Sequence, residues 1–167
     1  MKPRKVAQYG VLTALALMAG YMETLIPLPV PVPGIKLGIA NSVTIVCFYL
    51  YGRKCAWTVS LLRIFLSALL FGNVYSLAFS LSGGVMSLIA MTLAYRTGLF
   101  SVTGVSMLGG VTHNIGQIAA AAVILKAALI MGYIPVLTAG GIVSGMIIGL
   151  ISYMLIRRIK NGVYDHE

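Results

Sequence analysis

The sequence predicts an all-α integral membrane protein, a bundle of six transmembrane helices in a single membrane domain over residues 1–167. Of the 167 residues, 59% are hydrophobic and only 9% are charged, whereas soluble domains carry about 25% charged residues. The mean hydropathy is +0.99. Because a transmembrane helix needs roughly 20 apolar residues, the chain has room for about six spans and no soluble catalytic domain.

The first predicted span covers residues 6–26 and ends at the proline-rich stretch 27–34, which cannot continue a helix. Basic residues precede this span, as they do in a signal peptide. The apolar run is too long for one, however, and no cleavage site follows it, so we expect it to remain as a helix. Prolines at alternate positions should make the following loop stiff and extended. Such a loop would be either a lid over an outward-facing cavity or a rigid connector.

Five further spans are predicted over residues 37–51, 55–71, 74–95, 102–130 and 135–156. Short polar junctions separate the second, third and fourth spans. The start of the fifth span stays open, because the half-polar stretch 101–110 fits a helix or an interfacial segment. The sixth span begins at Pro135, a residue well suited to the first position of a helix.

The cations predict the orientation, since cytoplasmic loops of membrane proteins are enriched in Lys and Arg. The net charge is +9, and the charges fall between apolar blocks, which indicates topology signals and excludes nucleic-acid binding. With six spans and cytoplasmic termini, only Lys36 and Lys126 lie outside, and Arg63 lies within the third span. The remaining nine cations lie inside: Lys2, Arg4, Lys5, Arg53, Lys54, Arg96, Arg157, Arg158 and Lys160. We therefore expect both termini in the cytoplasm.

Small residues recur at four-residue spacing on two spans, which lets helix backbones approach closely in lipid. The last span carries Gly141, Gly145 and Gly149, for which packing within the bundle is favoured over docking of another subunit. The first span carries Gly10 with Ala14 and Ala16 with Gly20. No internal repeat is evident, which argues against carriers built from duplicated halves. Cys47 and Cys55 lack metal-site spacing and are expected to be small buried hydrophobes.

Polar side chains at membrane depth are costly and are therefore candidates for function. Glu23 lies one turn before the outer end of the first span, and Arg63 lies near the bilayer middle. Arg63 is interpreted equally well as a structural ion pair with Glu23, as a cap on backbone carbonyls, or as a ligand-binding residue. On the fifth span, His113 and Gln117 share a helical face with Asn114 beside them, which favours the wall of a polar cavity.

The second span adds a possible anion site at its outer end. Lys36 and the helix start around it would present positive charge and free N–H groups there, although Lys36 could equally extend to water. Asn41 lies on the same span, and Asn73 lies on the next outer loop. Cations and amides with few carboxylates favour an anionic ligand on an apolar body.

Several kinds of enzyme are excluded by what the sequence lacks. It has no P-loop motif, and its only acids are Glu23, Asp165 and Glu167. A magnesium-dependent enzyme acting on diphosphates needs several clustered carboxylates to hold its metal. Nor is a nucleophile accompanied by an organised base and acid. We therefore expect no catalytic residues, no bound metal and no cofactor.

An ordered series of motifs carries a family resemblance. The motifs are Pro33-Gly34-Ile35-Lys36-Leu37-Gly38-Ile39-Ala40-Asn41, Leu62-Arg63-Ile64, Gly72-Asn73, Ser82-Gly83-Gly84, Gly104-Val105-Ser106 and His113-Asn114-Ile115-Gly116-Gln117. Together they resemble the Gx transporter family, which is also catalogued as heptaprenyl diphosphate synthase component I. The resemblance covers nearly the whole chain. The synthase name conflicts with the scarcity of carboxylates, and we give the carboxylates more weight.

That family is similar to the S components of energy-coupling factor (ECF) transporters, six-helix capture subunits that work with a transmembrane scaffold and two ATPases. The resemblance implies a prokaryotic plasma-membrane protein with an outward-facing site beneath the first loop. It also implies a scaffold-docking face of small residues on the first helix, here Gly10, Ala14, Ala16 and Gly20. Relatives are associated with prenyl and quinone supply and with flavin-linked extracellular electron transfer.

The sequence thus predicts a substrate-binding subunit that captures a small anionic or amphipathic solute from outside. The residues expected to bind it are Lys36, Asn41, Arg63, Asn73, His113, Asn114 and Gln117. The alternative is a non-transporting membrane scaffold that assists prenyl diphosphate or quinone synthesis or an electron-transfer chain. A small molecule copurifying in the bundle would favour the first function, and a stable complex without a cavity would favour the second.

Overall fold

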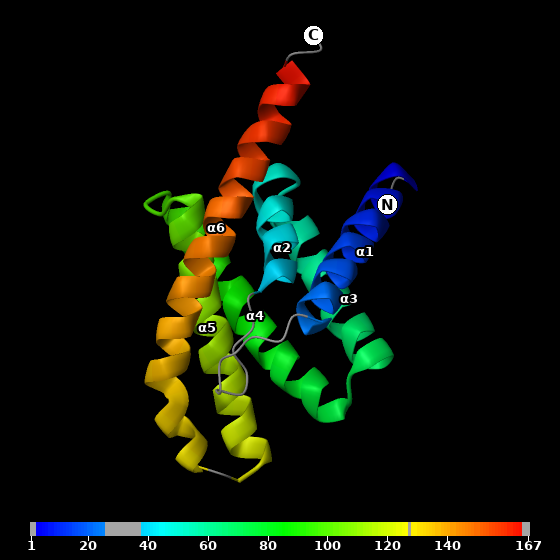
Figure 1. Ribbon diagram of the computed structural model, residues 1–167. Helices are drawn as coiled ribbons and strands as arrows, with labels where there is room; N and C mark the ends of the chain where they lie inside the picture. Colours follow the sequence, from blue (N-terminus) through cyan, green and yellow to red (C-terminus); the bar gives the residue numbers. More distant parts are fainter. Residues whose placement is uncertain (1–2, 26–37, 127, 165–167) are drawn as a thin grey trace.

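The computed structural model describes residues 3–25, 38–126 and 128–164 of the chain. These residues form six α-helices and one short 3-10 helix, and no strand occurs among them (Figure 1). The helices are α1 (Pro3–Leu25), α2 (Ile39–Leu50), α3 (Arg53–Phe71), α4 (Val74–Thr97), α5 (Val102–Ile124), η1 (Ala128–Tyr133) and α6 (Ile134–Tyr164). The predicted all-α membrane fold is confirmed.

Four of the described helical segments are long and apolar enough to cross a membrane: Arg53–Phe71, Val74–Thr97, Val102–Ile124 and Leu129–Asn161. The sequence predicted six spans, so two helices differ from that expectation. Helix α2 is apolar, but its 12 residues extend only roughly 18 Å at the helical rise. Helix α1 has 23 residues and includes Arg4, Lys5 and Glu23, which lower its mean hydropathy.

The structure settles the open start of the fifth span, and two predicted helix ends differ from it by more than three residues. The stretch 102–110 is helical, and the Ser101 side chain accepts a hydrogen bond from the N–H of Gly104 at 3.2 Å to cap α5. Helix α5 ends at Ile124 rather than at 130, and the residues Ala128–Tyr133 form η1. Helix α6 continues past 156 to Tyr164, because Arg and Lys favour helix although they end the apolar pattern that defined the span.

Glycines bring α4, α5 and α6 into close contact. A Cβ atom added to Gly116 of α5 would lie 2.9 Å from the Cα of Gly83 in α4. On another face of α5, a Cβ atom added to Gly110 would lie 2.5 Å from the carbonyl oxygen of Gly141 in α6. Only glycine permits such a backbone approach, which supplies the packing that holds membrane helices together.

The glycine stripe of the last span therefore packs within the bundle, as favoured from the sequence. Cβ atoms added to Gly145 and Gly149 would lie 2.7 Å from the Cα atoms of Met107 and Thr103, both in α5. The three glycines of α6 are spaced one helical turn apart, and so are the α5 residues that they contact. The stripe therefore stays in contact with α5 along its length. Helix α6 is thus fixed to α5 along one face.

The other three helices pack around a core of medium-sized side chains. Helix α1 contacts α2 and α3, and α2 also contacts α6. Phe48, Cys47, Cys55 and Val59 are among the most buried side chains of α2 and α3. Both cysteines are free and buried, which agrees with the expectation that they act as small hydrophobes.

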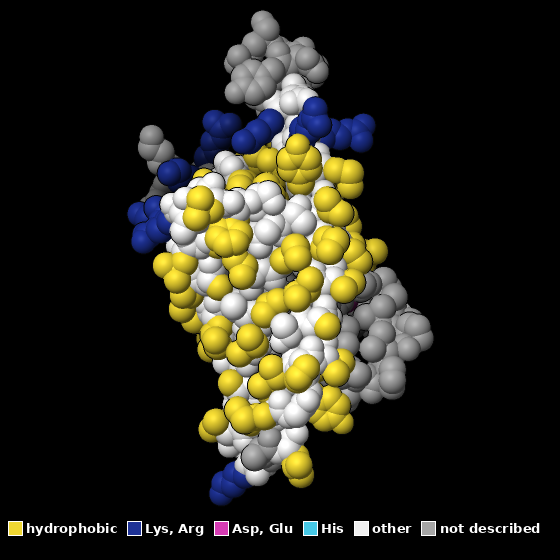
Figure 2. Space-filling model, turned by 90° about the vertical axis from the view of Figure 1, so that its left-hand side faces the viewer, with side chains coloured by type: hydrophobic (Ala, Val, Ile, Leu, Met, Phe, Trp, Pro, Cys, Tyr) yellow, Lys and Arg dark blue, Asp and Glu magenta, His cyan; other side chains and the backbone are white. Residues whose placement is uncertain are grey.

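Most of the described cations gather at one end of the bundle, seen as the dark blue side chains at the top of Figure 2. We call this end the basic end. The exposed cations on helix segments that meet there are Arg4, Lys5, Arg53, Lys54, Arg96, Arg157, Arg158 and Lys160. Lys126 follows the opposite end of α5. The start of α1 and the end of α6 both lie at the basic end (Figure 1).

Candidate functional site

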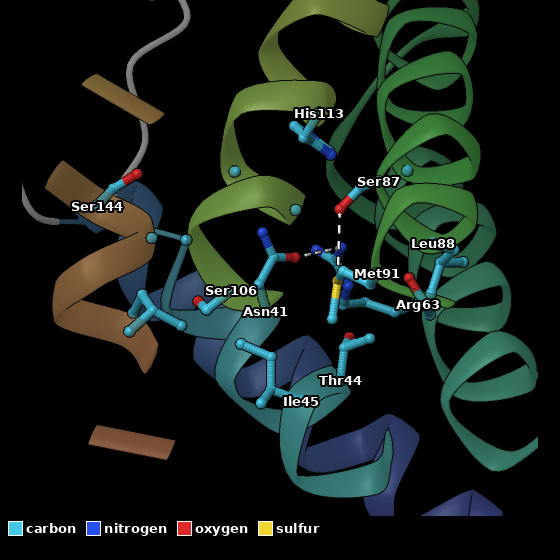
Figure 3. Close-up of a pocket in the computed structure, with 17 residues that line it drawn as sticks. Asn41, Thr44, Ile45, Arg63, Ser87, Leu88, Met91, Ser106, His113 and Ser144 are labelled. Carbon is cyan, nitrogen blue, oxygen red and sulfur yellow. Dashed lines mark hydrogen bonds between the residues drawn. The ribbon is translucent and has the colours of Figure 1, made fainter. Parts of the chain in front are cut away.

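Arg63 lies in the middle of α3 and turns inward to α2. Its guanidinium Nη2 donates a hydrogen bond to the Oδ1 of Asn41 at 3.3 Å (Figure 3). Its Nε is buried and has no hydrogen-bond partner among the described residues. A buried charged donor without a partner is energetically costly, so Arg63 has a capacity for hydrogen bonding that the described fold does not use.

Three cavities meet at Arg63, which lines all of them. The innermost, shown in Figure 3, has a volume of about 30 Å³ and is bounded by α2 to α6. A second, of about 80 Å³, lies among residues of α1 to α6. The third, of about 170 Å³, lies between α1, α3 and α4 towards Phe71 and Gly72. The cavities therefore extend from the bundle interior toward the end opposite the basic end.

The 80 Å³ cavity brings together five of the residues predicted from the sequence. Arg63 and Asn41 share its wall with His113, Asn114 and Gln117 of α5. Asn114 also donates to the backbone oxygen of Leu137 at 2.7 Å, so its amide fixes α5 to α6. The predicted polar stripe of the fifth span thus faces the buried arginine, and the wall presents amide and imidazole groups to it.

Glu23 is the carboxylate nearest to this site, and it lines the two larger cavities together with Arg63. It does not form the structural ion pair considered from the sequence. Its Oε1 accepts instead from the backbone N–H of Gly38 at 2.5 Å, while Arg63 bonds to Asn41. The arginine is therefore near a negative charge but not neutralised by direct contact with it.

The other two predicted binding residues are Lys36 and Asn73. Lys36 and the proline-rich loop lie outside the described residues. Asn73 is exposed at the start of α4, where its side chain accepts from the N–H of Ser76 at 2.8 Å. An Asx residue before a helix commonly caps it in this way. In the structure, Asn73 therefore caps the first turn of α4.

Sequence reasoning missed a set of hydroxyls around the arginine. The innermost cavity is lined by Thr44, Ser60, Ser87, Ser106 and Ser144, and the larger two by Ser80. The Thr44 hydroxyl is buried without a hydrogen-bond partner among the described residues. A usable signal was present, because four of these serines lie three or four residues from a glycine at a helix crossing. Those serines are Ser80, Ser87, Ser106 and Ser144.

The small residues of α1 are divided between two faces. Gly10 and Ala14 are exposed, and nothing lies within 4 Å of a Cβ atom added to Gly10. Ala16 is fully buried, and Gly20 packs near the Cβ of Ala40 in α2. The predicted docking residues therefore do not share one face, because residues 14 and 16 are two apart and so lie on nearly opposite sides of a helix.

A single cation surrounded by hydroxyl, amide and imidazole groups can bind an anion through several hydrogen bonds. The planar guanidinium matches carboxylate and phosphate oxygens, and the surrounding donors would complete their coordination. The described residues contain no cluster of His, Cys, Asp and Glu that could hold a metal ion. The groups around Arg63 can recognise a ligand by hydrogen bonding.

Comparison with known proteins gives one family match. The family model described as Heptaprenyl diphosphate synthase component I matches residues 12–155. Every residue named above as lining the three cavities lies within that range. No curated protein and no solved structure gives a significant match.

Proposed function

The chain belongs to the heptaprenyl diphosphate synthase component I family, and from this premise and the cavities around Arg63 we propose that it is a substrate-binding subunit of a membrane transporter. It captures a small anionic or amphipathic solute from the outside of the cell. It has no catalytic activity, because a diphosphate-transferring enzyme would need clustered carboxylates for its metal. The chain has only Glu23, Asp165 and Glu167.

The observation that carries this proposal is the incomplete hydrogen bonding of Arg63. A structural arginine in the core would be expected to satisfy its donors or to pair with an acid. Here Nε has no partner among the described residues, and Glu23 bonds elsewhere. An anionic group bound between Arg63 and the α5 amides would supply the missing acceptor.

The route of capture follows from the proposed topology. With the basic end in the cytoplasm, the 170 Å³ cavity near Phe71 and Gly72 faces outside, and solute would enter there. Energy for release would come from partners of the ECF type, a membrane scaffold and its ATPases, because the chain has no nucleotide-binding motif. The exposed Gly10 and Ala14 offer α1 a face for that scaffold, toward the basic end.

Mass spectrometry of the molecules extracted from purified protein tests this function. Wild type should yield an anionic small molecule at near-stoichiometric amount. Arg63→Ala should lose it while the folded protein is still recovered, and Arg158→Ala, which removes an exposed arginine of α6, should retain it. If the Arg63→Ala protein yielded as much of that molecule as the wild type, Arg63 would have a structural role and no role in binding.

A second function is favoured by one observation, the family description itself, which names a component of a synthase. In that case the chain would be a non-transporting scaffold that assists prenyl diphosphate or quinone synthesis, or a flavin-linked electron-transfer chain, through helix contacts. Purification from native membranes would then recover a stable complex with a prenyl transferase or redox protein. No small molecule would be extracted from the bundle.

A further inference from the structure

At the basic end, an open groove between α3 and α4 lies apart from the cavities around Arg63. It has a volume of about 550 Å³ and is lined by Arg53, Lys54, Trp57, Thr58, Thr92 and Arg96. The first turns of α3 supply four of these residues, and the last turns of α4 supply the other two. Three cations therefore surround one tryptophan and two threonines.

The cations of this groove have no counter-ion among the described residues. The one carboxylate in the described part of the chain, Glu23, bonds to Gly38 at the far end of α2. Helix α2 separates that bond from the groove by roughly 18 Å, about twice the distance over which physiological salt screens charges. Arg53, Lys54 and Arg96 are exposed, so they remain accessible to an external anion.

The floor of the groove is held in place by hydrogen bonds. The indole N–H of Trp57 donates to the hydroxyl of Thr92 at 3.2 Å, and Thr92 donates in turn to the backbone oxygen of Leu88 at 2.6 Å. This chain of bonds joins α3 to α4 and fixes the plane of the indole. Tryptophan is enriched at the membrane interface, where lipid headgroups lie.

We propose that this groove binds the headgroup phosphate of an anionic phospholipid. Basic pockets between transmembrane helices suit such headgroups, because clustered Lys and Arg attract the phosphate while neighbouring apolar surface accepts the acyl chains. The basic end is also the end that the positive-inside rule places in the cytoplasmic leaflet, which carries the anionic lipids. The site is independent of the solute bound at Arg63.

Trp57 makes the proposal directly measurable, since it is the only tryptophan in the chain. The protein would be reconstituted in phosphatidylcholine vesicles containing a minor, fixed fraction of phosphatidylglycerol. In one series the phosphatidylglycerol carries brominated acyl chains, and in the other an equal fraction of the phosphatidylcholine carries them. Bromine quenches tryptophan fluorescence on contact, so the two series compare how often each lipid occupies the groove.

The wild type should show roughly fivefold or greater preference for phosphatidylglycerol, and high salt should reduce it. The variant R53Q/K54Q/R96Q should show no preference. The matched control is R157Q/R158Q/K160Q, which removes the same charge from α6 at the same end and should keep the preference. Because these six residues are exposed, both variants should fold.

Three outcomes would overturn the proposal. Equal quenching by the two lipids in the wild type, or an equal loss of preference in both variants, would show a general surface effect and no site. Displacement of brominated phosphatidylglycerol by millimolar inorganic phosphate would identify a soluble phosphate as the occupant in place of the lipid. A preference that only the groove variant loses, and that inorganic phosphate leaves unchanged, would establish the lipid site.

Discussion

The carboxylate of Glu23 accepts a hydrogen bond from the backbone N–H of Gly38 at 2.5 Å, and this bond joins the end of α1 to the start of α2. Gly38 has a φ of 77°, a left-handed conformation that glycine adopts without strain. The same carboxylate lines two cavities with Arg63. Glu23 therefore holds two helices together and also places a negative charge beside the proposed anion site.

These two effects of Glu23 can be separated by substitution. Glu23→Gln keeps an oxygen that can accept from Gly38 but removes the charge that repels an anion. We expect it to bind the copurifying solute roughly three- to tenfold more tightly, measured by titrating extracted protein with that solute. Glu23→Ala also loses the hydrogen bond, and its unfolding free energy should fall by about 1 to 2 kcal/mol. Weaker binding by Glu23→Gln would argue against an anionic solute.

The geometry of Arg63 predicts that a positive charge alone is not enough to bind the solute. Arg63→Lys keeps a cation but loses the planar guanidinium that bonds Asn41 while leaving Nε available. We expect the lysine protein to recover only a small fraction of wild-type solute in the extraction assay. Full recovery would show that a point charge is enough and that the planar donor set is not used.

Close packing of α5 on α6 predicts a steric cost at Gly149. A methyl group there would lie 2.7 Å from the Cα of Thr103, so Gly149→Ala should destabilise the protein by about 1 to 3 kcal/mol. Circular dichroism during thermal unfolding in detergent measures this change. Gly10→Ala is the control, because the space around Gly10 is open, and it should be neutral or slightly stabilising.

The gathering of cations at one end predicts that both termini are cytoplasmic. Cysteines introduced at Gly132 and Asn161 would report on the two ends, because both residues are exposed and the native cysteines are buried. A membrane-impermeant maleimide should label position 132 in intact cells and position 161 only after the cells are opened. Labelling of position 161 from outside would reverse the topology.

The division of α1 into two faces predicts different effects for two neighbouring alanines. Ala14→Leu lies on the exposed face and should weaken association with an ECF-type scaffold, measured by pull-down from native membranes, while solute binding is unchanged. Ala16→Leu should instead lower thermal stability, since Ala16 is fully buried. If no scaffold is recovered with the wild type, the docking proposal fails and the alternative scaffold function gains support.

The helices could be predicted because the membrane imposes their length and composition on the sequence. Arg63 and the His113, Asn114 and Gln117 cluster could also be found, since polar groups at membrane depth are rare. The sequence could not show that Arg63 would donate to Asn41, or that Glu23 would accept from Gly38 instead of pairing with Arg63. That choice depends on how three helices cross, and helix crossings are not encoded in apolar periodicity.

Asn73 and the serines that line the innermost cavity show two further features of the site that sequence patterns do not predict. Asn73 had the right chemistry for a binding residue, but its position before α4 makes it a helix cap. Ser60 and Ser106 looked unremarkable, because a hydroxyl in a membrane helix usually bonds to its own backbone. Both became part of the site only where glycines brought the neighbouring helices close enough to enclose a cavity.

The small size of the cavities at Arg63 has a kinetic consequence. The innermost, about 30 Å³, has room for a water molecule or two, and the largest, about 170 Å³, is smaller than the 300 to 1,000 Å³ typical of ligand sites. A solute larger than these cavities would therefore bind a more open arrangement of the helices. If that arrangement were about 1% populated, the apparent Kd would be about 100-fold weaker than the intrinsic one. Association would then level off with rising solute concentration, at the rate of opening.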